Sequence, residues 1–130
     1  FAAINVLAMA AAYSPDPSAS PFPARLPIDF DTGAVDFDVL KSWRRFDPLV
    51  QVDDDIKADA LRALELLFID VGDRDEYNLH YGARRLNKKL LAAKIPHVYE
   101  EFPGGHGGSR HRFDRSLGLI ARALTDAGVV

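Results

Sequence analysis

Residues 65–108 decide the fold of this chain and read ELLFIDVGDRDEYNLHYGARRLNKKLLAAKIPHVYEEFPGGHGG. The apolar run 65–71 ends at Gly72, a pattern typical of a central parallel strand. A helix is predicted next, with an apolar face made of Leu79, Ala83, Leu86 and Leu90. Residues 95–102 are rich in β-branched and aromatic side chains, which favour a second strand. This order, with right-handed crossovers, predicts an α/β fold: a parallel sheet flanked by helices.

Both ends of the chain are apolar. A last amphipathic helix is predicted over residues 109–127, with an apolar face made of Phe113, Leu117, Ile120 and Leu124. Near the start, Ile4 and Val6 favour a buried strand over residues 3–13, although the alanine-rich remainder is equally compatible with a helix on periodicity alone. Because this apolar run opens directly at Phe1, we expect it to belong to the interior of a larger α/β domain.

The middle of the chain is polar and irregular. Five prolines between Pro15 and Pro27 remove backbone donors and exclude a helix, which predicts an extended surface segment. Asp36 is placed to cap a helix over residues 37–46. Residues 53–55, three consecutive aspartates, are placed to cap a helix over residues 56–64, whereas a calcium loop of the EF-hand type would space its ligands at alternate positions.

Composition excludes several classes of protein. The chain has 130 residues and a net charge of -3, and the proportions of hydrophobic and charged residues fit one ordinary globular domain. With no cysteine, disulfides, iron–sulfur clusters, thiol nucleophiles and thiolate zinc sites are excluded. The only dense basic cluster, on one predicted helix, is Arg84, Arg85, Lys88 and Lys89, so we expect no nucleic-acid partner. The apolar run 2–13 falls short of the ~20 residues that span a bilayer, so no membrane partner is expected.

Titratable side chains follow both predicted strands. The first strand is followed by residues 72–77, GDRDEY, and the second by residues 104–108, GGHGG. Ligands and catalytic groups collect at the carboxyl ends of parallel strands, so His106 and a carboxylate of the first loop are candidates for a general base and its orienting acid. An aspartate after a strand is also typical of a helix cap, and a histidine between glycines of a simple turn. Spacing alone leaves both interpretations open.

The amino-acid sequences of two segments resemble a known protein family. Residues 71–117, VGDRDEYNLHYGARRLNKKLLAAKIPHVYEEFPGGHGGSRHRFDRSL, strongly resemble the C-terminal part of an esterase family of α/β-hydrolases. This family contains S-formylglutathione hydrolases, enterochelin esterases, feruloyl esterases and mycolyltransferases. Residues 1–17, FAAINVLAMAAAYSPDP, resemble the strand and loop that follow the family's nucleophile. The resemblance implies an α/β-hydrolase fold of which this chain is the C-terminal portion.

The resemblance also implies site residues. Asp75 matches the acid and His106 the base of the family's Ser-His-Asp triad, with Glu76 the nearest alternative acid and Asp70 and Asp73 poorer ones. The other histidines are weaker candidates for the base because of their positions: His80, His97 and His111. No cofactor and no metal are expected. Residues 14–64 match the place of a loop and helical insertion near the substrate pocket, where Phe37, Trp43 and Phe46 are candidates for its wall or for helix core.

The nucleophile is missing from the sequence. The family's serine lies in a GxSxG turn, and no such motif occurs in residues 1–130. We expect it roughly 15 to 25 residues before Phe1, the length of a strand-to-strand crossover. The expected function is that of a serine carboxylic-ester hydrolase acting on a small-molecule ester, with this chain alone inactive. The alternatives are an acyltransferase on the same fold and a non-catalytic hydrolase-like binding module.

Overall fold

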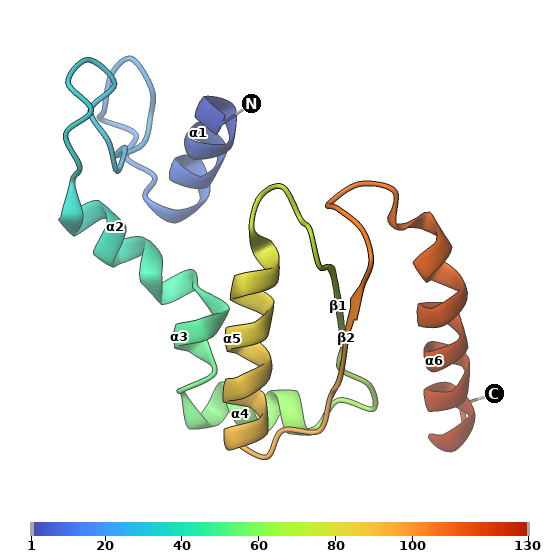
Figure 1. Cartoon of the computed structure of the whole chain (residues 1–130). Coiled ribbons are helices and arrows are strands. Elements are labelled where there is room, and N and C mark those ends of the chain that lie inside the picture. The colour runs from blue at the N-terminus through green and yellow to red at the C-terminus, as the bar shows by residue number, and fades with distance from the viewer. Residues whose placement is uncertain (1, 130) are drawn as a thin grey trace. The chain divides into compact units, whose positions relative to one another are not determined.

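The computed structural model describes residues 2–129 of the chain. The chain forms two compact units, Phe1–Val50 and Gln51–Val130. Their boundary falls inside residues 14–64, the stretch that the resemblance to esterases predicts to be an insertion. Helices and irregular segments make up the first unit, and the second unit contains the sheet (Figure 1).

The first unit contains helices α1 (Ala2–Tyr13) and α2 (Phe37–Trp43), the latter continuing as the 3-10 helix η1 (Arg44–Phe46). The Asp36 carboxylate caps α2 by accepting two main-chain N–H bonds, both of 3.0 Å, as predicted. The Tyr13 ring stacks on Phe46 at 4.7 Å between ring centroids, and the indole N–H of Trp43 donates to the Ser14 hydroxyl at 2.7 Å. Trp43 and Phe46 therefore pack within this unit, whereas Phe37 is 76% exposed.

The strand predicted over residues 3–13 is wrong, because this segment forms helix α1. Alanine has the highest helix propensity of all residues, and half of this helix is alanine. A helix also pairs its own backbone groups, whereas a strand would need a neighbouring strand to pair with. Residues 14–36 contain no helix, as the prolines predict, and hold two isolated antiparallel bridges, Pro15 with Ala24 and Ile28 with Val35.

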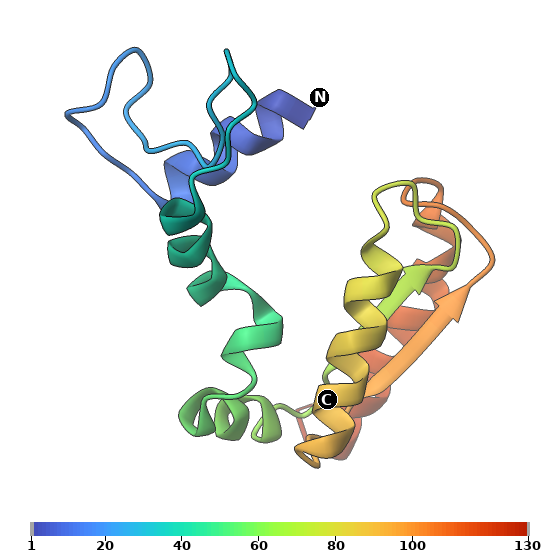
Figure 2. The same ribbon diagram turned by 60° about the vertical axis from the view of Figure 1, so that its left-hand side comes forward.

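The second unit contains the predicted parallel sheet. Strand β1 (Phe68–Gly72) pairs in parallel with strand β2 (Val98–Phe102), and the register runs from Phe68 opposite Val98 to Gly72 opposite Phe102. Helix α5 (Leu79–Ala92) connects the two strands, and α6 (Phe113–Asp126) follows the 3-10 helix η2 (Ser109–Arg112). Figures 1 and 2 show the strands side by side between α5 and α6. The unit is thus a small α/β arrangement of two strands flanked by helices.

The core of the second unit lies at the end of α5 and beside α4 (Asp55–Arg62), which is capped by Asp54. Its buried members are Val52, Ala58, Leu90 and Ile95. Leu86 and Ile69 pack against them and are partly buried, so the predicted apolar face of α5 is confirmed at its C-terminal half. Its first member, Leu79, is 51% exposed.

Helix α6 forms where the amphipathic pattern predicts it, but it buries none of its residues. Its apolar face is exposed, with Phe113 and Leu117 each 61% accessible to solvent. A sheet of two strands offers little area for a helix of this length to cover. Among residues 2–129, no helix is both long enough and apolar enough to cross a bilayer.

Candidate active site

Two loops meet at the carboxyl ends of the strands. We call residues 73–77, which follow β1, the acid loop, and residues 103–108, which follow β2, the histidine loop. Since Gly72 lies opposite Phe102 in the parallel register, both loops start at the same edge of the sheet, as both views show (Figures 1 and 2). The two strand ends therefore deliver the predicted site residues to one place.

Main-chain hydrogen bonds join the acid loop to the histidine loop. The Asp73 N–H donates to the Phe102 carbonyl at 2.9 Å, and the Arg74 N–H donates to the Gly104 carbonyl at 2.9 Å. In return, the Gly104 N–H donates to the Asp73 carboxylate at 3.0 Å. A Cβ atom at Gly72 would lie 2.5 Å from the carbonyl oxygen of Gly104, so only glycine permits this approach.

The predicted acid and base are in contact. Nδ1 of His106 lies 3.0 Å from Oδ2 of Asp75, and the Asp75 side chain is only 3% exposed. Its other oxygen accepts the Tyr77 N–H at 2.8 Å. Burial raises the pKa of Asp75, but the hydrogen bonds from the His106 ring and from the N–H groups of Tyr77 and Leu79 outweigh it and leave that pKa below its usual value. Asp75 is therefore an ionised acceptor at neutral pH.

An ionised Asp75 fixes the proton of His106. A carboxylate only accepts hydrogen bonds, so the neutral ring places its proton on Nδ1 and leaves the lone pair on Nε2. The ring side chain is 52% exposed, and within residues 2–129 Nε2 has no hydrogen-bond partner. The Tyr77 ring contacts the imidazole edge to face, at 4.8 Å between centroids. The pair has the geometry of an oriented general base that is open to solvent.

The alternative carboxylates are engaged elsewhere. Glu76 accepts the main-chain N–H of His106 at 2.8 Å and does not hydrogen-bond the ring. Asp70 forms an ion pair with Arg112, with 2.9 Å between Oδ2 of Asp70 and Nε of Arg112. Asp73 accepts the Gly104 N–H. Of the four acidic candidates, only Asp75 hydrogen-bonds the imidazole.

The other histidines take part in different contacts. Nδ1 of His97 lies 2.8 Å from the Ile95 carbonyl, and its Nε2 lies 2.8 Å from Asn87. His111 contacts the Gly108 carbonyl at 3.0 Å, and His80 is buried with Nδ1 unpartnered. Within residues 2–129, no group of three or more acidic or histidine side chains is arranged to hold a metal ion.

Several serine side chains hydrogen-bond to main-chain carbonyls away from His106. The Ser14 hydroxyl donates to the Arg25 carbonyl at 2.7 Å, Ser42 donates to Val39 at 2.7 Å, and Ser116 donates to Phe113 at 3.2 Å. In the part of the chain that the structure describes, no serine hydrogen-bonds to His106. The described residues therefore place a carboxylate and an imidazole together, but they place no serine hydroxyl beside the imidazole.

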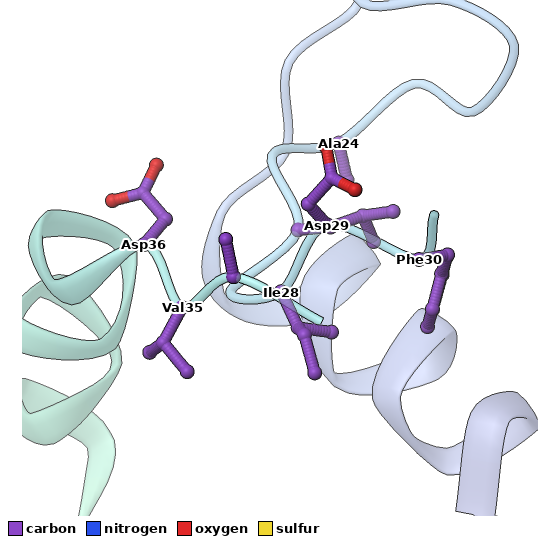
Figure 3. Close-up of a pocket in the computed structure, with 8 residues that line it drawn as sticks. Ala24, Ile28, Asp29, Phe30, Val35 and Asp36 are labelled. Atoms are coloured by element: carbon purple, nitrogen blue, oxygen red, sulfur yellow. The ribbon is translucent and has the colours of Figure 1, made fainter. Parts of the chain in front are cut away.

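A pocket of about 480 Å³ in the first unit offers less chemistry. Its two carboxylates, Asp29 and Asp36, extend away from the side chains of Ile28 and Val35 (Figure 3). Asp29 accepts N–H bonds within its own turn, from Asp31 at 2.9 Å and from Thr32 at 2.8 Å, and Asp36 caps α2. Both carboxylates thus hold local backbone, and the Asp75–His106 pair is the stronger candidate site.

Sequence reasoning missed the parts played by Asp73 and Glu76. It weighed both as acids for the imidazole, whereas both bind main-chain N–H groups of the histidine loop. The signal available was the pairing of an acidic loop with a loop of four glycines, in which no side chain shields the main-chain N–H groups from a carboxylate. Arg112, which bonds Asp70 and Glu100, was also not singled out.

Comparison of the sequence with known proteins assigns it to no family. No protein-family profile matches the sequence, and no curated protein matches it significantly. The resemblance of residues 1–17 and 71–117 to esterases therefore stays a prediction, and the functional argument depends on the geometry of the site.

Proposed function

We propose that Asp75 and His106 are the acid and base of a Ser-His-Asp triad in a serine carboxylic-ester hydrolase, with the serine supplied by sequence before residue 1. One observation carries the proposal. The Nδ1–Oδ2 contact of 3.0 Å joins a buried carboxylate to a half-exposed imidazole at the carboxyl ends of adjacent parallel strands. Acid and base of a triad need this hydrogen bond, and they need Nε2 free for the nucleophile.

The reaction follows from the roles of these groups. Nε2 of His106 removes the proton of the serine hydroxyl as its oxygen attacks the ester carbonyl, which forms a tetrahedral oxyanion. The oxyanion collapses, the protonated His106 gives the proton to the departing alcohol, and an acyl-serine remains. Nε2 then takes a proton from water, whose oxygen attacks the acyl carbonyl and forms a second tetrahedral oxyanion. When this oxyanion collapses, the bond to the serine oxygen breaks, Nε2 returns its proton to that oxygen, and the acid product leaves. The Asp75 carboxylate accepts the hydrogen bond from Nδ1–H throughout.

The fold we propose is that of an α/β-hydrolase, of which this chain is the C-terminal portion. The parallel pair with flanking helices supports this interpretation, since such folds place the triad on loops after parallel strands. Among the described residues, β1 pairs only with β2. The other edge of β1 is the place where a further parallel strand, followed by the serine, would bring a hydroxyl toward His106.

The test is an assay of the chain extended by the residues encoded before position 1. We expect hydrolysis of p-nitrophenyl acetate by the extended protein and none by residues 1–130 alone. His106→Ala and Asp75→Asn should each lower kcat by about 10⁴-fold, the first by removing the base and the second by disfavouring the productive tautomer. His97→Ala and Asp55→Asn are the matched controls and should leave kcat unchanged, because neither residue contacts the acid loop or the histidine loop.

Three outcomes would contradict the proposal. An extended protein without turnover would favour a non-catalytic module, and turnover by residues 1–130 alone would place the nucleophile within this chain. Full activity of the His106→Ala and Asp75→Asn variants would show that the pair is not the acid and base.

A further inference from the structure

His106 is held at two points by consecutive carboxylates. Asp75 bonds its ring, at 3.0 Å from Nδ1, and Oε2 of Glu76 accepts its main-chain N–H at 2.8 Å. The general-base role proposed above uses only the first contact. The second contact fixes the main chain from which the imidazole projects.

Gly105 makes the contact of Glu76 possible. A Cβ atom at this position would overlap the carboxylate oxygens of Glu76, so a side chain there would displace either Glu76 or the loop. The Cβ positions of Gly107 and Gly108, beyond His106, have no atom within 4 Å. Glu76 therefore approaches the histidine loop at a position that a side chain would block.

The loop needs such a contact because of its composition. Four of the six residues of the histidine loop are glycine, and glycine loses more conformational freedom on ordering than any other residue. Two main-chain N–H groups of the histidine loop donate to carboxylates: that of Gly104 to Asp73 and that of His106 to Glu76. A hydrogen bond to an ionised acceptor is stronger than one between neutral groups.

We infer that Glu76 is a positioning residue, whose carboxylate fixes the main chain of His106 so that the imidazole meets Asp75 and presents Nε2 outward. Its effect on catalysis depends on the proposed function, but its effect on the ring is a property of this chain. The His106 N–H also lowers the pKa of Glu76 below its ordinary value, which keeps the carboxylate ionised at neutral pH.

The experiment measures the tautomer of His106 by ¹⁵N NMR of residues 1–130 at a pH where the imidazole is neutral. In the wild-type chain we expect the Nδ1–H form to dominate, because Asp75 accepts that proton. Glu76→Ala should lower the ratio of the Nδ1–H to the Nε2–H form several-fold, since the freed loop leaves the ring in contact with Asp75 for less of the time. Glu76→Gln keeps an acceptor oxygen and should retain most of the ratio.

A second variant covers the case in which Glu76→Ala disturbs folding. Gly105→Ala keeps the Glu76 side chain, but the added Cβ displaces its carboxylate from the His106 N–H. This variant should therefore also lower the ratio of the Nδ1–H to the Nε2–H form. Glu65→Ala removes an exposed carboxylate that precedes β1 and is the matched control, with no expected change. In the extended protein, Glu76→Ala should lower kcat by up to about 10²-fold with KM little changed, as expected for a misplaced base.

The outcomes separate the two proposals. If Glu76→Ala and Gly105→Ala keep the wild-type ratio while Asp75→Asn abolishes it, Glu76 does not position the ring, and the acid–base pair still stands. If Asp75→Asn also keeps the ratio, the Asp75–His106 contact itself is wrong, and the proposed function fails with it. A reduced ratio in Glu76→Ala, retained in Glu76→Gln, supports the inference whether or not the extended protein hydrolyses esters.

Discussion

Helices α5 and α6 flank the same two strands and are both 14 residues long, yet only one of them is packed. Helix α5 buries Leu90 to 1% exposure in the core around Ile95. Helix α6 buries no residue, and ion pairs of Arg112 and Arg115 with Glu100 connect its N-terminal end to β2. An amphipathic pattern thus specifies that a helix forms and which face is apolar, whereas burial depends on the surface that neighbouring elements offer.

The sharpest test of this difference is the same truncation on each helix. Leu90→Ala should lower the free energy of unfolding by about 2–5 kcal/mol, because it removes a fully buried side chain and leaves a cavity. Leu117→Ala on α6 should change it by no more than about 0.5 kcal/mol, because that side chain is 61% exposed. Urea titrations of both variants measure the two values. Equal losses would show that α6 is packed as α5 is.

Glycine substitutions compare the C-terminal end of β1, where α5 is connected, with the interior of α6. Gly72→Ala should destabilise the chain by about 1–3 kcal/mol, because its Cβ would lie 2.5 Å from main-chain oxygens of Gly104 and Gly105. Gly118→Ala in α6 meets no atom within 4 Å and should stabilise by about 0.5–1 kcal/mol through helix propensity. Thermal unfolding distinguishes them by the sign of the change in Tm. A neutral Gly72→Ala would contradict the close approach of the two loops.

The smallest expected effect concerns the ion pair that connects α5 to β2. Arg84 donates two hydrogen bonds to Glu101, of 2.8 and 2.6 Å, and lowers the pKa of Glu101 to about 2 from 4.5. The unfolded chain therefore binds more protons than the folded chain between these values, so this pair stabilises fully above pH 4.5 and its contribution falls as the pH drops toward 2.

Removing Arg84 tests this pH dependence. Arg84→Gln should be less stable than wild type at neutral pH, and the difference should shrink through that acid window. Because the Arg84 side chain is 43% exposed, solvent screens its charge, and the loss in the free energy of unfolding should be modest. Chemical denaturation at several pH values measures it. A difference that is independent of pH would show that packing of the Arg84 side chain, rather than its charge, supports the contact.

Much of the second unit was predictable from local pattern. The strands predicted over 65–71 and 95–102 are observed as Phe68–Gly72 and Val98–Phe102, because apolar runs that end at glycine or proline have few alternatives in this context. The prediction failed at α1, where an unbroken apolar run carries no period and alanine propensity decided the outcome. The exposure of the α6 face was equally out of reach, because it depends on the extent of the sheet.

The candidate site also has contacts that could be predicted from the sequence and contacts that could not. Contact between His106 and a carboxylate of the acid loop was predictable because parallel strands bring their carboxyl ends together, and the resemblance to esterases implied that this carboxylate is Asp75. The contact of these two residues is confirmed. Their catalytic roles stay predictions. The contact of Glu76 with the His106 main chain was not predictable, because every residue except proline carries the same N–H donor and only the folded loop shows which donor lies near which carboxylate.

The parallel pairing of β1 and β2 has a consequence for descent. Asp75 and His106 lie on successive loops of one strand–helix–strand segment, within residues 68–106. A recombination crossover outside that segment transfers both groups together, already facing each other, whereas a crossover within α5 parts them. An exchange of the whole segment therefore keeps the two residues of the Asp75–His106 contact on one contiguous stretch of chain.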